Sequence, residues 1–264
     1  MQPTPPEVVI ANIAFIAFWV FIVALIWLGG QRFERTRAFR ERMIAQWKPA
    51  LAITAIFLIS NGLASRSPIN PYLLAIFCQV LIGLALARGI AGYEPLKTTQ
   101  SILRRERMVQ NIVLLVAISI IAGIVGLFIG AVGLGIVQSI FHETNRTSEL
   151  AQSFSINKMQ AFFQLLWGAG IAEETTYRLV ALSFVWAMTR RRWLAIFISA
   201  LLFAAYHLSP LDGLYLKFWQ FPISQFVSTV FIGMVWGYVF TRRDYETSVL
   251  SHTLSDWLPM LLFM

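Results

Sequence analysis

Charged side chains are scarce in this chain of 264 residues. Only 13% of the residues are charged, and 58% are hydrophobic. Soluble globular proteins carry about 25% charged residues, so the composition excludes an ordinary water-soluble domain and indicates a protein solvated mostly by lipid. A membrane-spanning helix needs about 20 apolar residues, so the length allows about eight to ten spans and no separate soluble domain.

Cysteine is almost absent. Cys78 is the only one, so the chain forms no disulfide within itself and builds no cysteine-based metal cluster. This residue stands in an apolar run, where a buried thiol acts as a small hydrophobic side chain. We therefore expect Cys78 to have a packing role.

Long apolar runs fill the rest of the sequence and predict an all-α, polytopic membrane helical bundle with about eight transmembrane helices. The expected spans are about 8–29, 50–65, 71–92, 109–141, 159–189, 193–208, 218–241 and 247–264. The fourth run also contains a row of glycines, for which we expect a packing role because small residues let helix backbones approach closely. The row consists of Gly123, Gly126, Gly130, Gly133 and Gly135.

The basic residues alternate between the predicted loops. Of the 21 Lys and Arg, which give a net charge of +8, 15 lie in the loops after the first, third, fifth and seventh spans. Because cytoplasmic loops are rich in Lys and Arg, this pattern predicts a multi-pass protein of the cell (plasma) membrane with both termini outside the cytoplasm. The same spread over four short loops argues against nucleic-acid binding, which needs one basic face.

Two of the basic segments, 31–48 and 94–108, have two interpretations. Each can lie as an amphipathic helix on an anionic leaflet, or it can serve as a solvated connector. The sequence favours neither.

Six ionisable side chains stand out inside the predicted spans of the carboxyl-terminal half. Burying one at a helix centre costs roughly 2.5–3.5 kcal/mol on insertion scales, so each is a candidate functional residue. A polar cluster that only fixes helix packing is the alternative. Together, however, these residues include a general base and electrophilic stabilisers, the groups needed to activate a water molecule. They are Glu173, Glu174, Arg178, His207, His252 and Asp256.

Their spacing predicts which of them pair. Glu174 and Arg178 lie four residues apart and are expected to form an ion pair on one helix face. Glu173 is rotated by about 100° from Glu174, so it needs another partner, for which the histidines are candidates. His252 and Asp256 are also four apart, which lets the carboxylate orient the imidazole.

The same residues belong to three successive motifs. Residues 173–178 have the form EExxxR, residues 203–207 the form FxxxH, and residues 252–256 the form HxxxN/D. In this order on successive hydrophobic segments, they resemble the CPBP family of CAAX-protease and bacteriocin-processing intramembrane endopeptidases, which is also called Abi-like. The resemblance covers about 160–264. It favours a division into N-terminal membrane helices over 1–150 and a catalytic membrane core over 151–264.

The resemblance implies an endopeptidase of the type that releases the carboxyl-terminal tripeptide from prenylated proteins. Its expected partners are the lipid bilayer and a hydrophobic or lipidated peptide or protein. By motif position, Glu173 is the base that activates water, His207 and His252 stabilise the oxyanion, and Asp256 takes the place often held by Asn. Three further motif residues are expected to support the site: Glu174, Arg178 and Phe203.

Two positions depart from the family pattern. Asp256 adds negative charge where an amide would donate a hydrogen bond, so an oxyanion role there requires that its carboxyl is protonated or pairs with a histidine. Leu179 follows Arg178 where glycine is frequent, which we expect to alter only helix packing.

The cofactor stays open at this stage. The family is often labelled a metalloprotease, and Glu173, His207 and His252 would give a divalent metal such as zinc three ligands and one open position. The chain lacks a His-Glu-x-x-His helix motif, and a metal-free glutamate mechanism fits these residues equally well.

Two other functional classes use similar residues. A proton- or ion-coupled transporter or channel also needs membrane carboxylates and histidines, although the hydropathy pattern shows no inverted repeat. A catalytically silent immunity protein that binds a hydrophobic peptide is the other.

Straight helices predict a mismatch in depth between the motifs. At 1.5 Å per residue, Glu173 and His207 lie roughly 20 Å from the cytoplasmic ends of their spans, whereas His252 lies only about 8 Å in. The three residues meet only if the eighth span starts deeper, the helices tilt strongly, or the boundaries shift.

Overall fold

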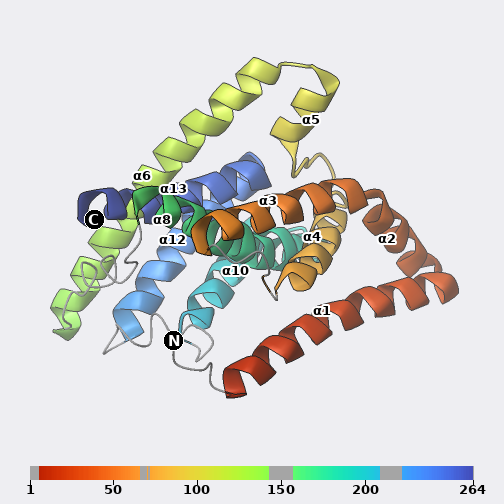
Figure 1. The fold of residues 1–264 in the computed structure, drawn as a ribbon, viewed down its shortest axis with the longest axis horizontal. Coiled ribbons are helices and arrows are strands. Elements are labelled where there is room, and N and C mark those ends of the chain that lie inside the picture. The colour runs from red at the N-terminus through yellow and green to blue at the C-terminus, as the bar shows by residue number, and fades with distance from the viewer. Residues whose placement is uncertain (1–5, 66–69, 71, 143–156, 209–221, 264) are drawn as a thin grey trace.

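The computed structural model describes residues 6–65, 70, 72–142, 157–208 and 222–263, and these form helices without a strand (Figure 1). This confirms the all-α prediction. Four helices are long and apolar enough to cross a membrane. They cover Asn12–Arg32, Trp47–Ala64, Met108–Phe141 and Ile223–Arg242.

The amino-terminal half follows the predicted order of apolar runs. It contains α1 (Pro6–Arg32), α2 (Glu34–Ala45), α3 (Trp47–Ser65), α4 (Leu73–Ala87), α5 (Lys97–Arg104) and α6 (Met108–Phe141). The first four predicted spans correspond to α1, α3, α4 and α6, and α4 is a shorter apolar helix than predicted. The basic segments 31–48 and 94–108 contain the short helices α2 and α5.

The carboxyl-terminal half contains one long helical run and three further helices. The elements are α8 (Lys158–Leu165), the π-helices η1 (Leu166–Glu173) and η2 (Thr175–Leu182), α9 (Ser183–Thr189), α10 (Arg192–Tyr206), α12 (Pro222–Arg242) and α13 (Tyr245–Phe263). The run starts where the Asn157 side chain accepts a hydrogen bond from the Gln160 amide at 2.8 Å, an N-terminal cap. The predicted fifth span, 159–189, is therefore one continuous element. Eight membrane crossings remain a prediction.

The apolar core lies around α4 and η2. Val80 and Leu84 of α4 pack with Leu179 and Leu182 of η2 and with Ile196 of α10, all of them buried. Cys78 is also buried on α4 and has no disulfide partner, in line with its predicted packing role. This core holds the long helical run in place.

The glycine row lets α6 approach α12 and α13. A Cβ atom added at Gly130 would lie 2.5 Å from Ile232 of α12, and one at Gly123 would lie 3.2 Å from Leu254 of α13. Gly126 similarly faces Ser255 and Trp236, whereas a Cβ atom at Gly135 would meet nothing within 4 Å. The predicted packing role is confirmed for the first three glycines.

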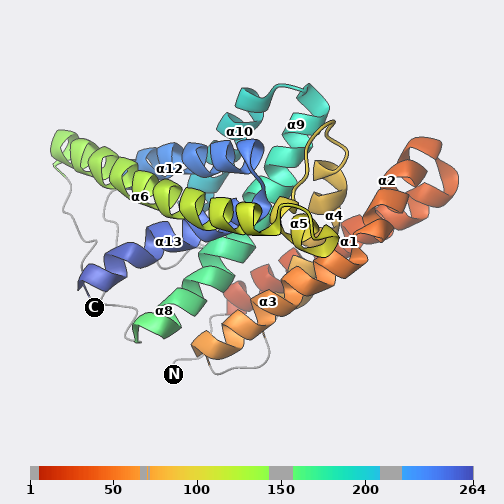
Figure 2. The same cartoon turned by 90° about the horizontal axis from the view of Figure 1, so that it is seen from above.

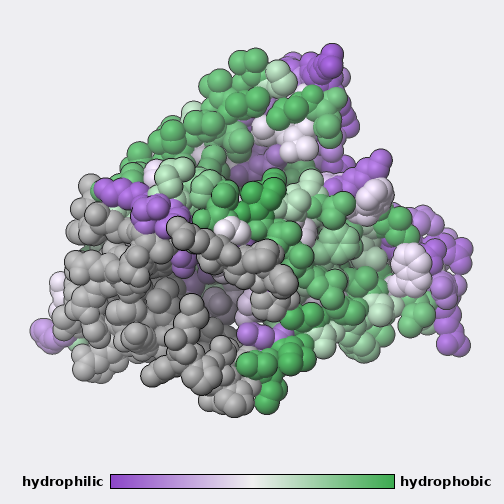
Figure 3. All heavy atoms as spheres, viewed as in Figure 1, coloured by the Kyte–Doolittle hydropathy of each residue, from purple (hydrophilic) through white to green (hydrophobic). Residues whose placement is uncertain are grey.

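The basic segment after the third predicted span packs against the carboxyl-terminal half of the chain. The Tyr93 hydroxyl donates to the Phe240 carbonyl at 2.7 Å, and its ring lies 5.4 Å from that of Trp186. The Thr98 amide donates to the Glu246 carboxylate at 2.8 Å. These contacts connect the segment after the third predicted span to α9, to the end of α12 and to the first turn of α13. Hydrophilic residues cover the ends of the molecule near α2 and α5, while α6 is hydrophobic (Figure 3). Which side faces the cytoplasm remains a prediction.

Candidate active site

The candidate site is centred on the side chain of Glu174, which is fully buried. Its Oε1 lies 2.9 Å from His252 Nδ1 and 3.4 Å from Arg178 Nε, and its Oε2 accepts a hydrogen bond from the Ser248 hydroxyl. The predicted ion pair between Glu174 and Arg178 is therefore confirmed. A buried carboxylate is stable only when its oxygens are paired, and here both are.

The other face of His252 meets two further carboxylates. Its Nε2 lies 3.7 Å from Glu173 Oε2 and 3.4 Å from Asp256 Oδ2. The imidazole thus stands between Glu174 on one side and Glu173 and Asp256 on the other. This arrangement supplies the histidine partner that the rotation of Glu173 away from Glu174 predicts.

Exposure separates the three carboxylates. The side chain of Glu174 is 0% exposed, whereas those of Glu173 and Asp256 are 22% and 32% exposed. Only Glu173 and Asp256 are therefore accessible to a water molecule or substrate. Glu174 is enclosed by its partners and can act only through His252 and Arg178.

Aromatic rings hold the imidazole in place. The Trp236 ring stacks on the His252 ring at 3.6 Å between centroids and 19° between planes, and Phe203 meets it edge-on at 5.6 Å. The Arg178 guanidinium lies 4.5 Å above the Phe203 ring, and its Nη2 donates to the Gly233 carbonyl at 3.3 Å. Cations are stabilised over aromatic faces in this way.

His207 lies next to this group through Phe203. The imidazole of His207 is 4% exposed, and its ring meets Phe203 edge-on at 4.7 Å. Phe203 therefore contacts both histidines of the motifs. The preceding turn of α10 is fixed to η2, because the Ser199 hydroxyl donates to the Tyr177 carbonyl at 2.7 Å.

The structure brings His252 to the glutamates, although straight helices predict a mismatch in depth. The first residue of α13, Tyr245, donates its amide to the Pro95 carbonyl at 2.9 Å, and its hydroxyl forms hydrogen bonds with Thr175 Oγ1 at 2.7 Å and with the Ile171 carbonyl at 3.4 Å. From there α13 runs alongside α6 and the long helical run (Figure 2), so His252 reaches Glu174. Both glutamates sit where η1 meets η2, and π-helical turns frequently mark functional sites.

Both departures from the family pattern have a structural counterpart. Asp256 pairs with His252, one of the two conditions under which a carboxylate suits this position. Leu179 is fully buried against Gly83 of α4, where an added Cβ atom would lie 2.6 Å from Leu179 Cγ. The leucine thus fills a space that a glycine on the neighbouring helix leaves open, which makes the second departure a matter of packing.

The arrangement does not fit the metal alternative. Among the described residues, no group of three or more His, Cys, Asp or Glu side chains is placed to hold a metal ion. The Phe203 ring contacts both His207 and His252, at 4.7 Å and 5.6 Å between ring centroids. We therefore derive no step through a metal.

Two contributors to the site are absent from the motifs. Ser248 precedes His252 by four residues, so helical spacing alone places it on the same face. Trp236 lies on α12, and no local signal links it to His252, because their stacking depends on how α12 packs against α13.

A helical membrane protein with carboxylates, histidines and an arginine buried together on three helices has the groups of an intramembrane hydrolase. Residues 155–258 match the family model described as type II CAAX prenyl endopeptidase Rce1-like. This match includes all three motifs and confirms the predicted resemblance. It supports a CAAX-type intramembrane protease in general terms. No curated protein and no solved structure matches the chain.

Proposed function

We propose that this protein hydrolyses a peptide bond in a membrane-associated, lipidated or hydrophobic protein, with Glu173 as the base that activates water. The observation that carries the proposal is the position of His252 between buried Glu174 and the more exposed Glu173 and Asp256. A base must reach the water whose proton it takes. Of the two adjacent glutamates, Glu173 has the exposed side chain.

The reaction uses these groups in two steps. Glu173 takes a proton from water, and the resulting hydroxide oxygen bonds to the carbonyl carbon of the scissile peptide. Negative charge then develops on the carbonyl oxygen, where His252 and His207 donate hydrogen bonds. When the carbon–nitrogen bond breaks, the proton held by Glu173 passes to the leaving amine. Such preorganised donors stabilise charge most strongly where water is scarce.

The contacts on Nδ1 support the assignment of His252 as a donor through Nε2. Glu174 accepts from Nδ1 at 2.9 Å, which orients the ring. The separations from Nε2 to Glu173 and Asp256, 3.7 Å and 3.4 Å, exceed the usual 2.7–3.2 Å of such bonds. In the proposed reaction, a substrate oxygen that enters beside Glu173 and Asp256 replaces these longer contacts at Nε2.

A cellular experiment tests this function and identifies the substrate. Membrane peptides from cells with the native protein are compared by mass spectrometry with those from a deletion strain and from cells with Glu173→Gln. We expect the same uncleaved peptide to accumulate in the deletion strain and in the cells with Glu173→Gln. The purified Glu173→Gln protein should still bind this peptide. A transporter or a silent binding protein would leave all membrane peptides unchanged, and that result would refute the proposal.

A further inference from the structure

A cavity of about 620 Å³ lies outside the candidate site, between α5 and the beginning of α6. Residues between Glu94 and Asn111 line it. This volume is in the range of small-ligand sites, about 300–1,000 Å³. The family match over 155–258 does not include these residues.

Positive charge dominates the wall of the cavity. Lys97, Arg104 and Arg107 line it together with two acids, Glu94 and Glu106. The Glu94 carboxylate is already engaged, because it pairs with Arg88 at 3.0 Å and accepts a hydrogen bond from the Leu96 amide at 3.0 Å. Three cations against one remaining acid favour an anionic ligand.

The first turn of α5 is fixed to α13 by Glu246. The Glu246 carboxylate accepts hydrogen bonds from the Thr98 and Thr99 amides at 2.8 Å and 3.1 Å, and from the Thr99 hydroxyl at 2.5 Å. These amides are free donors at the start of any helix, and an acidic side chain satisfies them. Lys97 therefore projects from an anchored helix end.

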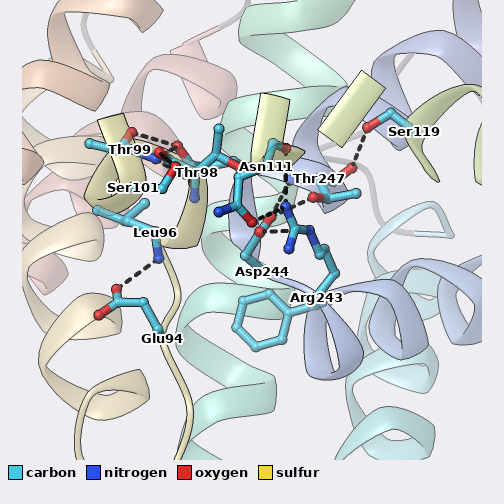
Figure 4. A network of polar contacts seen from close by, with 12 residues as sticks. Glu94, Leu96, Thr98, Thr99, Ser101, Asn111, Ser119, Arg243, Asp244 and Thr247 are labelled. Atoms are coloured by element: carbon cyan, nitrogen blue, oxygen red, sulfur yellow. Dashed lines mark hydrogen bonds and ion pairs between the residues drawn. The ribbon is translucent and has the colours of Figure 1, made fainter. Parts of the chain in front are cut away.

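The far wall of the cavity is fixed as well. Arg243 donates to the carbonyl of Asn111 at 3.1 Å and to its side-chain oxygen at 3.0 Å, and it pairs with Asp244 at 3.3 Å (Figure 4). Asn111 lines the cavity from the first turn of α6. The residues around the cavity are thus fixed by two polar anchors, Arg243 just after α12 and Glu246 in the first turn of α13.

Exposed apolar side chains lie on the same two helices as the cavity. Leu103 of α5 is 73% exposed, and Val109 and Val113 at the start of α6 are 67% and 58% exposed. They continue into the apolar surface of the candidate span Met108–Phe141. A ligand with a negative headgroup and acyl chains matches both surfaces, since basic pockets at the ends of membrane helices bind anionic lipid headgroups.

We propose that this cavity binds the phosphate of an anionic phospholipid through Lys97, Arg104 and Arg107, with the acyl chains along α6. The proposal gives segment 94–108 a defined lipid site on the side predicted to be cytoplasmic. It does not depend on peptidase activity.

Native mass spectrometry of the full chain in neutral detergent tests the proposal. The protein is titrated with phosphatidylglycerol and with phosphatidylcholine, each alone and in the presence of inorganic phosphate. We expect phosphatidylglycerol adducts to persist where phosphatidylcholine adducts do not. The triple variant Lys97→Gln, Arg104→Gln, Arg107→Gln should weaken phosphatidylglycerol binding at least about tenfold, because each basic contact contributes to headgroup affinity.

A matched variant removes the same charge elsewhere. Arg37, Arg190 and Arg191 are exposed in other basic segments and do not line the cavity, so their replacement by Gln should leave adducts at the native level. Equal loss in both triple variants, or equal retention of the two lipids, would overturn the proposal. Phosphate binding without lipid adducts would overturn the lipid assignment. The single variants Lys97→Gln and Arg107→Gln provide the comparison if the triple variant misfolds, and native-level adducts in both would contradict the proposal.

Discussion

At the scale of single residues, two adjacent glutamates differ in burial. The side chain of Glu174 is closed off by His252, Arg178 and Ser248, whereas that of Glu173 is 22% exposed beside His252 Nε2. Helical rotation predicts that they face different partners. Only the packed structure shows that both glutamates lie next to the same histidine, His252.

Removing the hydroxyl of Ser248 tests the supporting role of Glu174. Ser248→Ala leaves one oxygen of a buried carboxylate without its hydrogen bond, a loss of about 1–3 kcal/mol. Because Glu174 orients His252, we expect kcat to fall about tenfold or more, with KM nearly unchanged. Steady-state kinetics in detergent measure this.

Ser251→Ala is the matched control. Ser251 is also buried on α13, but its hydroxyl donates to the Thr247 carbonyl of its own helix. Its removal should leave kcat near the native value. An equal effect of both variants would show that Ser248 acts through the general stability of α13 rather than through Glu174.

At the scale of elements, the site depends on close contact between η1 and α13. Gly170 of η1 faces Thr253 of α13, where an added Cβ atom would lie 2.3 Å from the Thr253 hydroxyl oxygen. This contact lies one turn from the glutamates on η1 and next to His252 on α13. A larger residue there must separate the two elements that carry the proposed base and donor.

Gly170→Ala should therefore reduce cleavage and destabilise the fold. Overpacking of this kind costs about 1–3 kcal/mol, and a small displacement of catalytic groups lowers kcat about 100-fold. Gly168→Ala is the control on the same helix, because a Cβ atom there meets nothing within 4 Å. Thr253→Ala should partly restore the Gly170→Ala variant. If Gly170→Ala and Gly168→Ala have equal kcat and unfolding temperature, the close contact does not matter.

The Gly83 and Leu179 pair makes a second prediction at this scale. Gly83→Ala places a methyl group 2.6 Å from Leu179 Cγ, so we expect a loss of about 1–3 kcal/mol in stability. In combination with Leu179→Ala, the added methyl group should cost much less. Thermal unfolding of the native protein, the two single variants and the double variant measures this coupling. Strictly additive losses of stability would contradict it.

The anchor between α5 and α13 makes stability depend on pH. Burial raises the pKa of Glu246 above its ordinary value of 4.5, although the hydrogen bond from the Thr99 side chain lowers it. The folded state therefore holds the proton more tightly, and this contribution to stability is present below pH 4.5 and is lost as the pH rises through the raised pKa. Burial also raises the pKa of Asp244, which adds to the same trend.

Glu246→Gln should flatten this dependence. We expect the unfolding temperature of the native protein to fall between pH 4.5 and neutral pH, and that of the variant to fall less. Asp244 remains in the variant, so the unfolding temperature of the variant should still depend on pH to some extent. If the unfolding temperature of the variant falls as steeply with pH as that of the native protein, the Glu246 carboxyl does not titrate between pH 4.5 and neutral pH.

At the scale of the whole molecule, composition and charge predict the helical membrane class because lipid selects long apolar runs. The candidate site residues can also be predicted from the sequence, because ionisable side chains are rare within long apolar runs. The position of His252 is different. Straight helices place it too shallow, whereas in the structure its Nδ1 lies 2.9 Å from Glu174 Oε1. Trp236 likewise enters the site through tertiary packing, which periodicity cannot reveal.

The central claim is that Glu173 activates water for peptide hydrolysis. The most direct test incubates the purified protein with a peptide identified in the cellular comparison, in water enriched in oxygen-18. Mass spectrometry of the new carboxyl terminus should show one oxygen from water with the native protein. Cleavage by Glu173→Gln should be about 10²–10⁴-fold slower. Cleavage by this variant at the native rate would contradict the account.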